Sequence, residues 1–114
     1  MTDCIFCKIA AGEIPATFVY RDELVVAFRD VAPQAPTHVL VVPRRHVADA
    51  DALEPADEAL VGRMALVAAR LARELGVAAD GYRLVLNTGP HGGQVVPHLH
   101  LHLLAGRPLA AELG

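Results

Sequence analysis

His98-Leu99-His100-Leu101-His102-Leu103-Leu104 is the stretch that decides the fold, because histidine and leucine alternate in it with the period of a β-strand. Successive side chains of a strand point to opposite faces, so the three imidazoles are predicted on one face and leucines on the other. Imidazole changes charge near neutral pH and serves as nucleophile, proton carrier or metal ligand. The stretch therefore predicts a strand with one core face and one reactive face, the alternative being a polar strand face or an accidental repeat.

Four further strands are predicted upstream of this stretch. Residues 18–20 and 24–28 read as a hairpin around the polar turn Arg21-Asp22-Glu23. Residues 38–42 read as a buried strand that ends at Pro43, and residues 82–87 as a strand that leads into the glycine-rich loop 88–94. Strands that follow one another through short turns predict an antiparallel sheet.

Two helices complete the expected α+β fold. Residues 4–11 suit a short amphipathic helix that stops at Gly12, and residues 55–75 suit a long helix that stops at Gly76. The apolar positions of the long helix fall on one face: Leu60, Val61, Met64, Val67, Ala68, Leu71 and Leu75. We expect both helices on one side of the sheet and a single domain over residues 1–114.

Composition limits the class of protein. Of the 114 residues, 54% are hydrophobic and 4% aromatic, so an aliphatic core of a soluble globular protein is expected. The net charge of −3 is spread over interleaved acidic and basic residues, which argues against binding to nucleic acid or to a membrane surface. The N-terminus lacks the pattern of a secretory signal and no apolar run is long enough to cross a membrane, so a cytoplasmic location is expected.

The cysteines Cys4 and Cys7 form a C-x-x-C motif. In a reducing compartment this spacing indicates metal ligands or a redox pair rather than a structural disulfide. A redox pair would need a thioredoxin-like βαβ context, which this sequence does not offer.

The histidines themselves point to attack on phosphorus. Alternate strand residues lie two rises of about 3.3 Å apart, which keeps their rings parallel and lets two of them, but not all three, converge on one metal. The central ring, His100, is flanked by His98 and His102 and can be held in one tautomer while its free nitrogen attacks. Upstream, Gly92-Gly93-Gln94 lets backbone N–H groups approach an anion closely.

At this point the chain resembles the histidine triad (HIT) family, whose pattern His-φ-His-φ-His-φ-φ is matched by residues 98–104. The likeness is closest to the Hint branch, the purine nucleoside phosphoramidases, and spans almost the whole chain. It also rests on the segments 5–9 (IFCKI), 28–31 (FRDV), 33–38 (PQAPTH), 43–46 (PRRH) and 92–94 (GGQ). The resemblance implies a HIT fold: a five-stranded antiparallel sheet with one long and one or two short helices, dimerising into a ten-stranded sheet.

The resemblance also implies a reaction that cleaves the P–N bond of a purine nucleoside 5′-phosphoramidate, of the AMP-lysine or AMP-NH₂ type. His100 would attack the α-phosphorus to form a nucleotidyl-histidine, and water would then release the nucleoside monophosphate. His102 would donate the proton to the departing group, and His98 and His38 would support the nucleophile. Gln94 and the Gly93 backbone would hold the phosphate.

The nucleoside site follows from the same resemblance. Asp30 corresponds to the acid that binds the ribose hydroxyls, and Asn87 to a polar residue near the phosphate. Val95 stands where the Hint branch usually carries serine, so one hydroxyl that could touch the phosphate is missing. The residues corresponding to the purine sandwich are Ile5, Phe6, Ile9, Phe28, Val31 and Leu40. Without the resemblance, Phe6 and Phe28 read as plain core residues.

Family members that keep the C-x-x-C motif imply a structural zinc site made by Cys4, Cys7, His46 and His98, the alternative being two free buried thiols. The eukaryotic Hint branch lacks these cysteines, so no cofactor is expected to be required for the chemistry. Two alternatives to a phosphoramidase remain open. One is a dinucleoside polyphosphate hydrolase or nucleotidyltransferase of the same family, and the other is a noncatalytic nucleotide-binding or zinc-binding interaction module.

Overall fold

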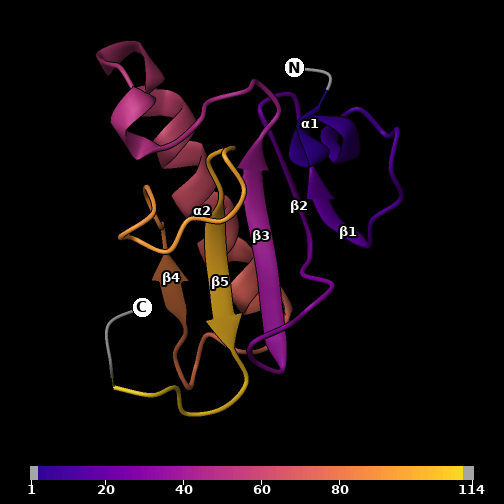
Figure 1. Ribbon diagram of the computed structural model, residues 1–114. Coiled ribbons are helices and arrows are strands. Elements are labelled where there is room, and N and C mark those ends of the chain that lie inside the picture. Colours follow the sequence, from indigo (N-terminus) through magenta and orange to yellow (C-terminus); the bar gives the residue numbers. More distant parts are fainter. Residues whose placement is uncertain (1–2, 112–114) are drawn as a thin grey trace.

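A five-stranded antiparallel sheet with the strand order β1-β2-β3-β5-β4 organises the computed structural model, which describes residues 3–111 (Figure 1). The elements in chain order are α1 (Ile5–Ala10), β1 (Phe18–Arg21), β2 (Val25–Arg29), β3 (Thr37–Pro43), the 3₁₀ turns η1 (Ala50–Ala52) and η2 (Pro55–Asp57), α2 (Glu58–Glu74), β4 (Arg83–Val85) and β5 (Leu101–Ala105). The predicted α+β class and antiparallel pairing are confirmed.

The long helix α2 covers one face of the sheet, and Figure 1 shows it passing behind β3 and β5. The predicted apolar stripe is confirmed for Leu60, Met64, Val67, Ala68 and Leu71, which are buried against the sheet. The predicted first turn at Pro55 is a 3₁₀ turn that leads into the α-helix. Within residues 3–111, no helix is long and apolar enough to cross a membrane.

The short helix α1 covers the opposite face, so the prediction that both helices pack on one side is wrong. Its Phe6 and Ile9 pack against Phe28, Leu40 and other residues of β2 and β3 that point away from α2. The physical reason lies in these two central strands, which are buried along almost their whole length. Because both of their faces are apolar, each face needs its own cover.

The histidine-rich stretch is only partly a strand. β5 begins at Leu101, so the prediction of a strand from His98 is wrong for its first residues. The chain bends at residues 96–98, where the N–H of His98 bonds to the carbonyl of Val96 at 2.8 Å. The alternation of faces nevertheless holds, because Leu99, Leu101 and Leu103 all enter the core beneath α2. β4 is also shorter than the predicted strand 82–87, because its pairing with β5 ends at Val85, opposite His102.

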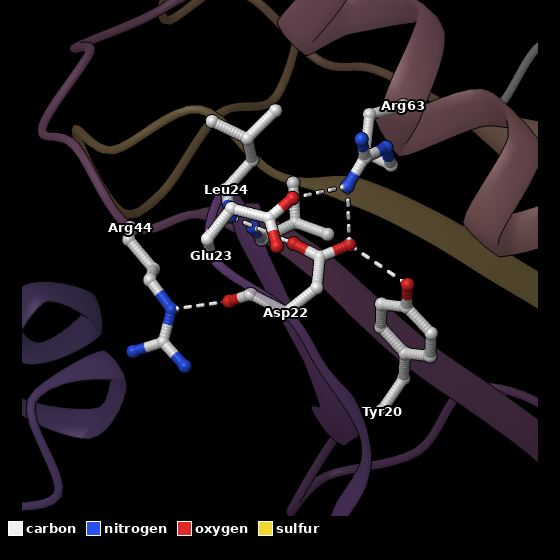
Figure 2. Close-up of polar contacts among 7 residues, drawn as sticks. Tyr20, Asp22, Glu23, Leu24, Arg44 and Arg63 are labelled. Atoms are coloured by element: carbon white, nitrogen blue, oxygen red, sulfur yellow. Dashed lines mark hydrogen bonds and ion pairs between the residues drawn. The ribbon is translucent and has the colours of Figure 1, made fainter.

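The turn between β1 and β2 is tied to α2 by Asp22 (Figure 2). The carboxylate accepts hydrogen bonds from the backbone N–H groups of Leu24 at 2.7 Å and Val25 at 2.8 Å. It also accepts from the Tyr20 hydroxyl at 2.7 Å and from Arg63 of α2 at 2.7 Å. One side chain thus closes the predicted hairpin and fixes it to the helix.

Candidate active site and metal centre

A pocket of about 560 Å³ opens on the face of the sheet that α1 covers. Its walls come from α1 and the segment after it, its floor from β2 and β3, and its reactive side from His38, His100 and His102. The structure brings together every residue predicted to bind substrate except Gln94: Ile5, Phe6, Ile9, Phe28, Asp30, Val31, Leu40, Asn87, Gly93 and Val95.

His100 is held in one tautomer. Its Nδ1 lies 2.6 Å from the backbone carbonyl of His98, and a carbonyl can only accept, so Nδ1 carries the proton. The lone pair of Nε2 is therefore free. The ring is buried, it lines the pocket, and the edge-on ring of Phe6 packs against it with centroids 5.1 Å apart. This arrangement suits a nucleophile.

His102 and His38 form a chain of hydrogen bonds with a defined direction. The backbone N–H of Gln34 donates to Nδ1 of His38 at 3.0 Å, so the His38 proton is on Nε2. That Nε2 lies 2.9 Å from Nδ1 of His102 and 3.5 Å from a carboxylate oxygen of Asp30. Nδ1 of His102 therefore accepts, which leaves its Nε2–H as a donor.

Burial keeps both of these histidines neutral. Burial, with smaller contributions from the neighbouring His100 and His38, lowers the pKa of His102 to about 4 even though the carboxylate of Asp30 opposes that shift. Burial also lowers the pKa of His38, although the carboxylate of Asp30 opposes that shift. Neutral rings at pH 7 allow the tautomers described above to persist.

Loop 88–94 is braced by side chains that were predicted to touch phosphate. Asn87 donates to the carbonyl of Gly92 at 2.6 Å while also lining the pocket. The amide of Gln94 accepts from the N–H of Gly89 at 3.0 Å and donates to the carbonyls of Ala48 at 2.8 Å and Val96 at 3.0 Å. Gln94 does not line the pocket, so its geometry fits a support for the loop better than the predicted contact with phosphate.

The rim of the pocket is apolar and open. Val31 is 99% exposed and Val95 is 89% exposed, yet both line the pocket. Sequence reasoning missed the segment Ile14-Pro15-Ala16, which forms part of the wall after α1. The signal that could have revealed it is an apolar tripeptide that lies outside any predicted helix or strand.

A second group of residues, the thiol–imidazole cluster, consists of Cys4, Cys7, His46 and His98. Its ligand atoms all lie within 4.8 Å of one another. The Nδ1 atom of His98 is 3.2 Å from Sγ of Cys4 and 3.6 Å from Sγ of Cys7, and Nδ1 of His46 is 3.4 Å from Sγ of Cys7. A tetrahedral zinc site with ordinary bond lengths has sulfur–nitrogen edges of about 3.6 Å, so these residues fit zinc.

The protonation chemistry of the cluster also suits a cation. The Nε2 atom of His98 lies 2.9 Å from the carbonyl of Pro43, which places its proton there and aims the free Nδ1 at the sulfurs. Burial lowers the pKa of His98, so the ring is neutral as a metal ligand must be. Burial raises the pKa of Cys7, and the adjacent Cys4 raises it further through a hydrogen bond and through the repulsion that two thiolates without a cation would feel. The Pro43 carbonyl is a functional group that no side-chain motif could have revealed.

Comparison with known proteins gives a consistent result. The model of the HIT domain family matches residues 11–109. The purine nucleoside phosphoramidase of Escherichia coli K12 is 50% identical over 111 residues, which cover 97% of this chain and 93% of that protein.

Two solved structures extend the comparison. A HIT family hydrolase from Legionella pneumophila superposes with a TM-score of 0.96 at 47% identity, covering 98% of this chain and 100% of that one. A zinc-bound histidine triad family protein from Mycobacterium smegmatis superposes with a TM-score of 0.80 at 34% identity, covering 93% of this chain and 76% of that one.

Proposed function

The chain belongs to the HIT domain family and is a hydrolase of that family, and from this premise we propose that it cleaves the P–N bond of purine nucleoside 5′-phosphoramidates. The observation that carries the proposal is His100, whose Nε2 lone pair is free on a ring that lines an apolar pocket. The name of the Escherichia coli relative, a purine nucleoside phosphoramidase, supports the same substrate class.

The reaction has two steps. Nε2 of His100 attacks the α-phosphorus, forming a new P–N bond as the bond from phosphorus to the departing amine breaks. Water then attacks the phosphorus of the nucleotidyl-histidine. The bond to Nε2 breaks, the nucleoside monophosphate leaves, and the His100 lone pair is restored.

His102 supplies the proton that the amine takes as it leaves. Its Nε2–H is the free end of the hydrogen-bond chain from Gln34 through His38. A phosphoryl anion beside the ring raises the pKa of the imidazole, so His102 takes up a second proton together with substrate. The imidazolium gives its Nε2 proton to the amine and is left as the neutral ring. In the second step the attacking water returns a proton to the same nitrogen.

The pocket accounts for the nucleoside part of the substrate. Phe6, Phe28 and Leu40 offer apolar contact to a purine ring, and Asp30 offers a carboxylate to the ribose hydroxyls. Gly93 and Asn87 line the same pocket and would contact the phosphate, and the exposed Val95 replaces a polar contact at the rim. We assign Gln94 to the support of this loop.

Zinc in the thiol–imidazole cluster would be structural. Cys4, Cys7, His46 and His98 would hold it, and the cation would supply a cross-link between α1 and the sheet, with no cofactor taking part in the reaction. Thiolate ligands persist where thiols stay reduced, so we assign the protein to the cytoplasm.

We propose that a second copy of the chain pairs at β4. This strand is one edge of the sheet, and Leu84 within it and Leu86 just after it are 39% and 38% exposed. Together with Val61 and Ala65 of α2 they border an apolar cavity of about 120 Å³. An unpaired edge next to exposed leucines is a surface that a symmetric dimer would cover, joining two sheets into one of ten strands.

Trapping the intermediate tests the reaction. The protein is mixed with adenosine 5′-phosphoramidate, quenched without acid, and analysed by mass spectrometry while turnover is recorded in parallel. We expect an AMP adduct on His100 in the wild type, and neither adduct nor turnover in His100→Asn. The exposed His91 offers a matched control, and His91→Asn keeps both.

Nucleotide binding without adduct or turnover would favour the noncatalytic module. Faster cleavage of diadenosine polyphosphates than of phosphoramidates would favour the dinucleoside polyphosphate hydrolase.

A further inference from the structure

We infer that the thiol–imidazole cluster is a positioning device for the reaction, through which a bound zinc ion orders both the nucleophile and the wall of the nucleotide pocket. The inference rests on the proposed function, because it concerns how that site is held. Cys4, Cys7 and His46 become positioning residues, because none of the three lines the pocket and all three act through His98 and α1.

The first connection runs through one residue, His98. Its ring carries the cluster ligand Nδ1 and bonds to the carbonyl of Pro43 through Nε2, while its own backbone carbonyl lies 2.6 Å from Nδ1 of His100. The residue is completely buried. A cation on Nδ1 therefore restrains the ring that positions the acceptor for the nucleophile. Without one, Nδ1 has only weak contacts with thiols.

A second backbone bond strengthens this connection. The N–H of Leu99, next to His98, donates to the carbonyl of Val47 at 2.7 Å. Val47 follows His46, the cluster ligand that comes after β3. The two histidine ligands of the cluster thus lie on adjacent chain segments joined by a main-chain hydrogen bond, and a shared cation would lock both segments together.

The other connection runs through α1. This helix has only six residues, too few to be stable on its own, so its position depends on what it is attached to. Cys4 at its N-cap and Cys7 in its first turn belong to the cluster, while Phe6 packs between Phe28 and His100. Fixing the two sulfurs fixes the aromatic ring that borders both the purine site and the nucleophile.

These connections predict a reciprocal coupling between zinc and nucleotide. If zinc tightens AMP binding by some factor, AMP must tighten zinc binding by the same factor. We expect about a fivefold to tenfold effect, within the range usual for coupled sites. We also expect zinc to hold His100 in the single tautomer with its proton on Nδ1.

The test reads His100 directly, without turnover. Long-range ¹H–¹⁵N NMR spectra of the imidazoles are recorded for zinc-loaded protein and for protein stripped by a chelator, with far-UV circular dichroism to verify folding. We expect one sharp Nδ1-protonated form of His100 with zinc and an exchanging mixture without it. Calorimetry then gives AMP affinity in both states, and competition with a chromogenic chelator gives zinc affinity with and without AMP.

Two variants sharpen the test. His46→Asn leaves three ligands, so zinc binds more weakly and the His100 signal shifts part of the way toward that of stripped protein. This variant keeps the test usable even if complete removal of zinc unfolds the chain. His91→Asn removes an exposed histidine outside the cluster and matches the wild type.

Two results would overturn the inference. One is an unchanged His100 spectrum in stripped or His46→Asn protein. The other is an AMP affinity that zinc changes by less than twofold, together with a zinc affinity that AMP changes by less than twofold. Failure of the proposed function looks different, since zinc-loaded protein would then show no adduct and no turnover while His100 still responded to zinc.

Discussion

Replacing Asp22 by asparagine tests how much one polar side chain contributes to the frame around the site. Its carboxylate receives four hydrogen bonds from Tyr20, Leu24, Val25 and Arg63, and its side chain is 12% exposed (Figure 2). Asparagine keeps a neutral acceptor for the two backbone N–H groups but turns an NH₂ group toward Arg63. Hydrogen bonds to charged groups contribute about 1.5–3 kcal/mol against about 1 kcal/mol for neutral ones, so we expect a loss of about 2–3 kcal/mol.

The pH dependence of this loss has a definite sign. Burial raises the pKa of Asp22, but the N–H of Val25, the Tyr20 hydroxyl, the N–H of Leu24 and Arg63 outweigh it and hold the pKa well below its usual range. The folded chain therefore binds fewer protons than the unfolded chain. The stabilisation is complete above about pH 5 and is lost as the pH falls through the usual value of about 3.9 toward the folded pKa.

Urea unfolding followed by circular dichroism measures both effects, because the chain contains no tryptophan to report by fluorescence. Glu23→Gln is the matched control: Glu23 pairs with the same Arg63 at 3.1 Å, but its side chain is 75% exposed, so its loss should stay below about 0.5 kcal/mol. Equal losses for the two variants would refute the reasoning. A difference between wild type and Asp22→Asn that stays constant down to about pH 2.5 would refute it as well.

Two further predictions concern loop 88–94 and the sheet edge. In Gly92→Ala the new Cβ would overlap the backbone oxygen of Thr88, so the loop must move, and we expect kcat/KM for adenosine 5′-phosphoramidate to fall at least about tenfold. The helical control Gly62→Ala has nothing within 4 Å and should gain about 0.5–1 kcal/mol with unchanged kinetics; equal kinetics for both variants would contradict the loop argument. Leu84→Glu places a charge on the edge strand β4 itself and should convert a dimer into monomers in sedimentation, whereas a variant of wild-type mass would argue against pairing there.

The sequence predicted most of the architecture because its signals are local. Apolar runs bounded by turn residues located four strands, alternation located the histidine-rich one, and the spacing from Leu60 to Leu71 located α2. The side of the sheet that α1 occupies was not local information, since it depends on β2 and β3 needing cover on both faces. The start of β5 was missed because a bend near Pro97 interrupts a run whose side chains still alternate.

The site was predictable as a set of side chains but not as a set of bonds. All of the residues expected to bind substrate except Gln94 line the pocket, and the four expected zinc ligands come together. The partners that define their chemistry are main-chain groups: the carbonyl of His98, the carbonyl of Pro43 and the N–H of Gln34. Because every residue carries such groups, residue identity alone gives no sign of which of them will be used.

The acceptor that orients His100 is a peptide oxygen, and this has a consequence for how such a site can change over generations. No codon change at position 98 deletes that oxygen, whereas a single change there removes a zinc ligand. Substitutions can therefore remove the cluster ligand by ligand and loosen the hold on His100, while the acceptor itself stays in the chain. Descendants of this chain can therefore lose their need for zinc gradually, while they keep the peptide oxygen that accepts from His100 for as long as the backbone keeps its path.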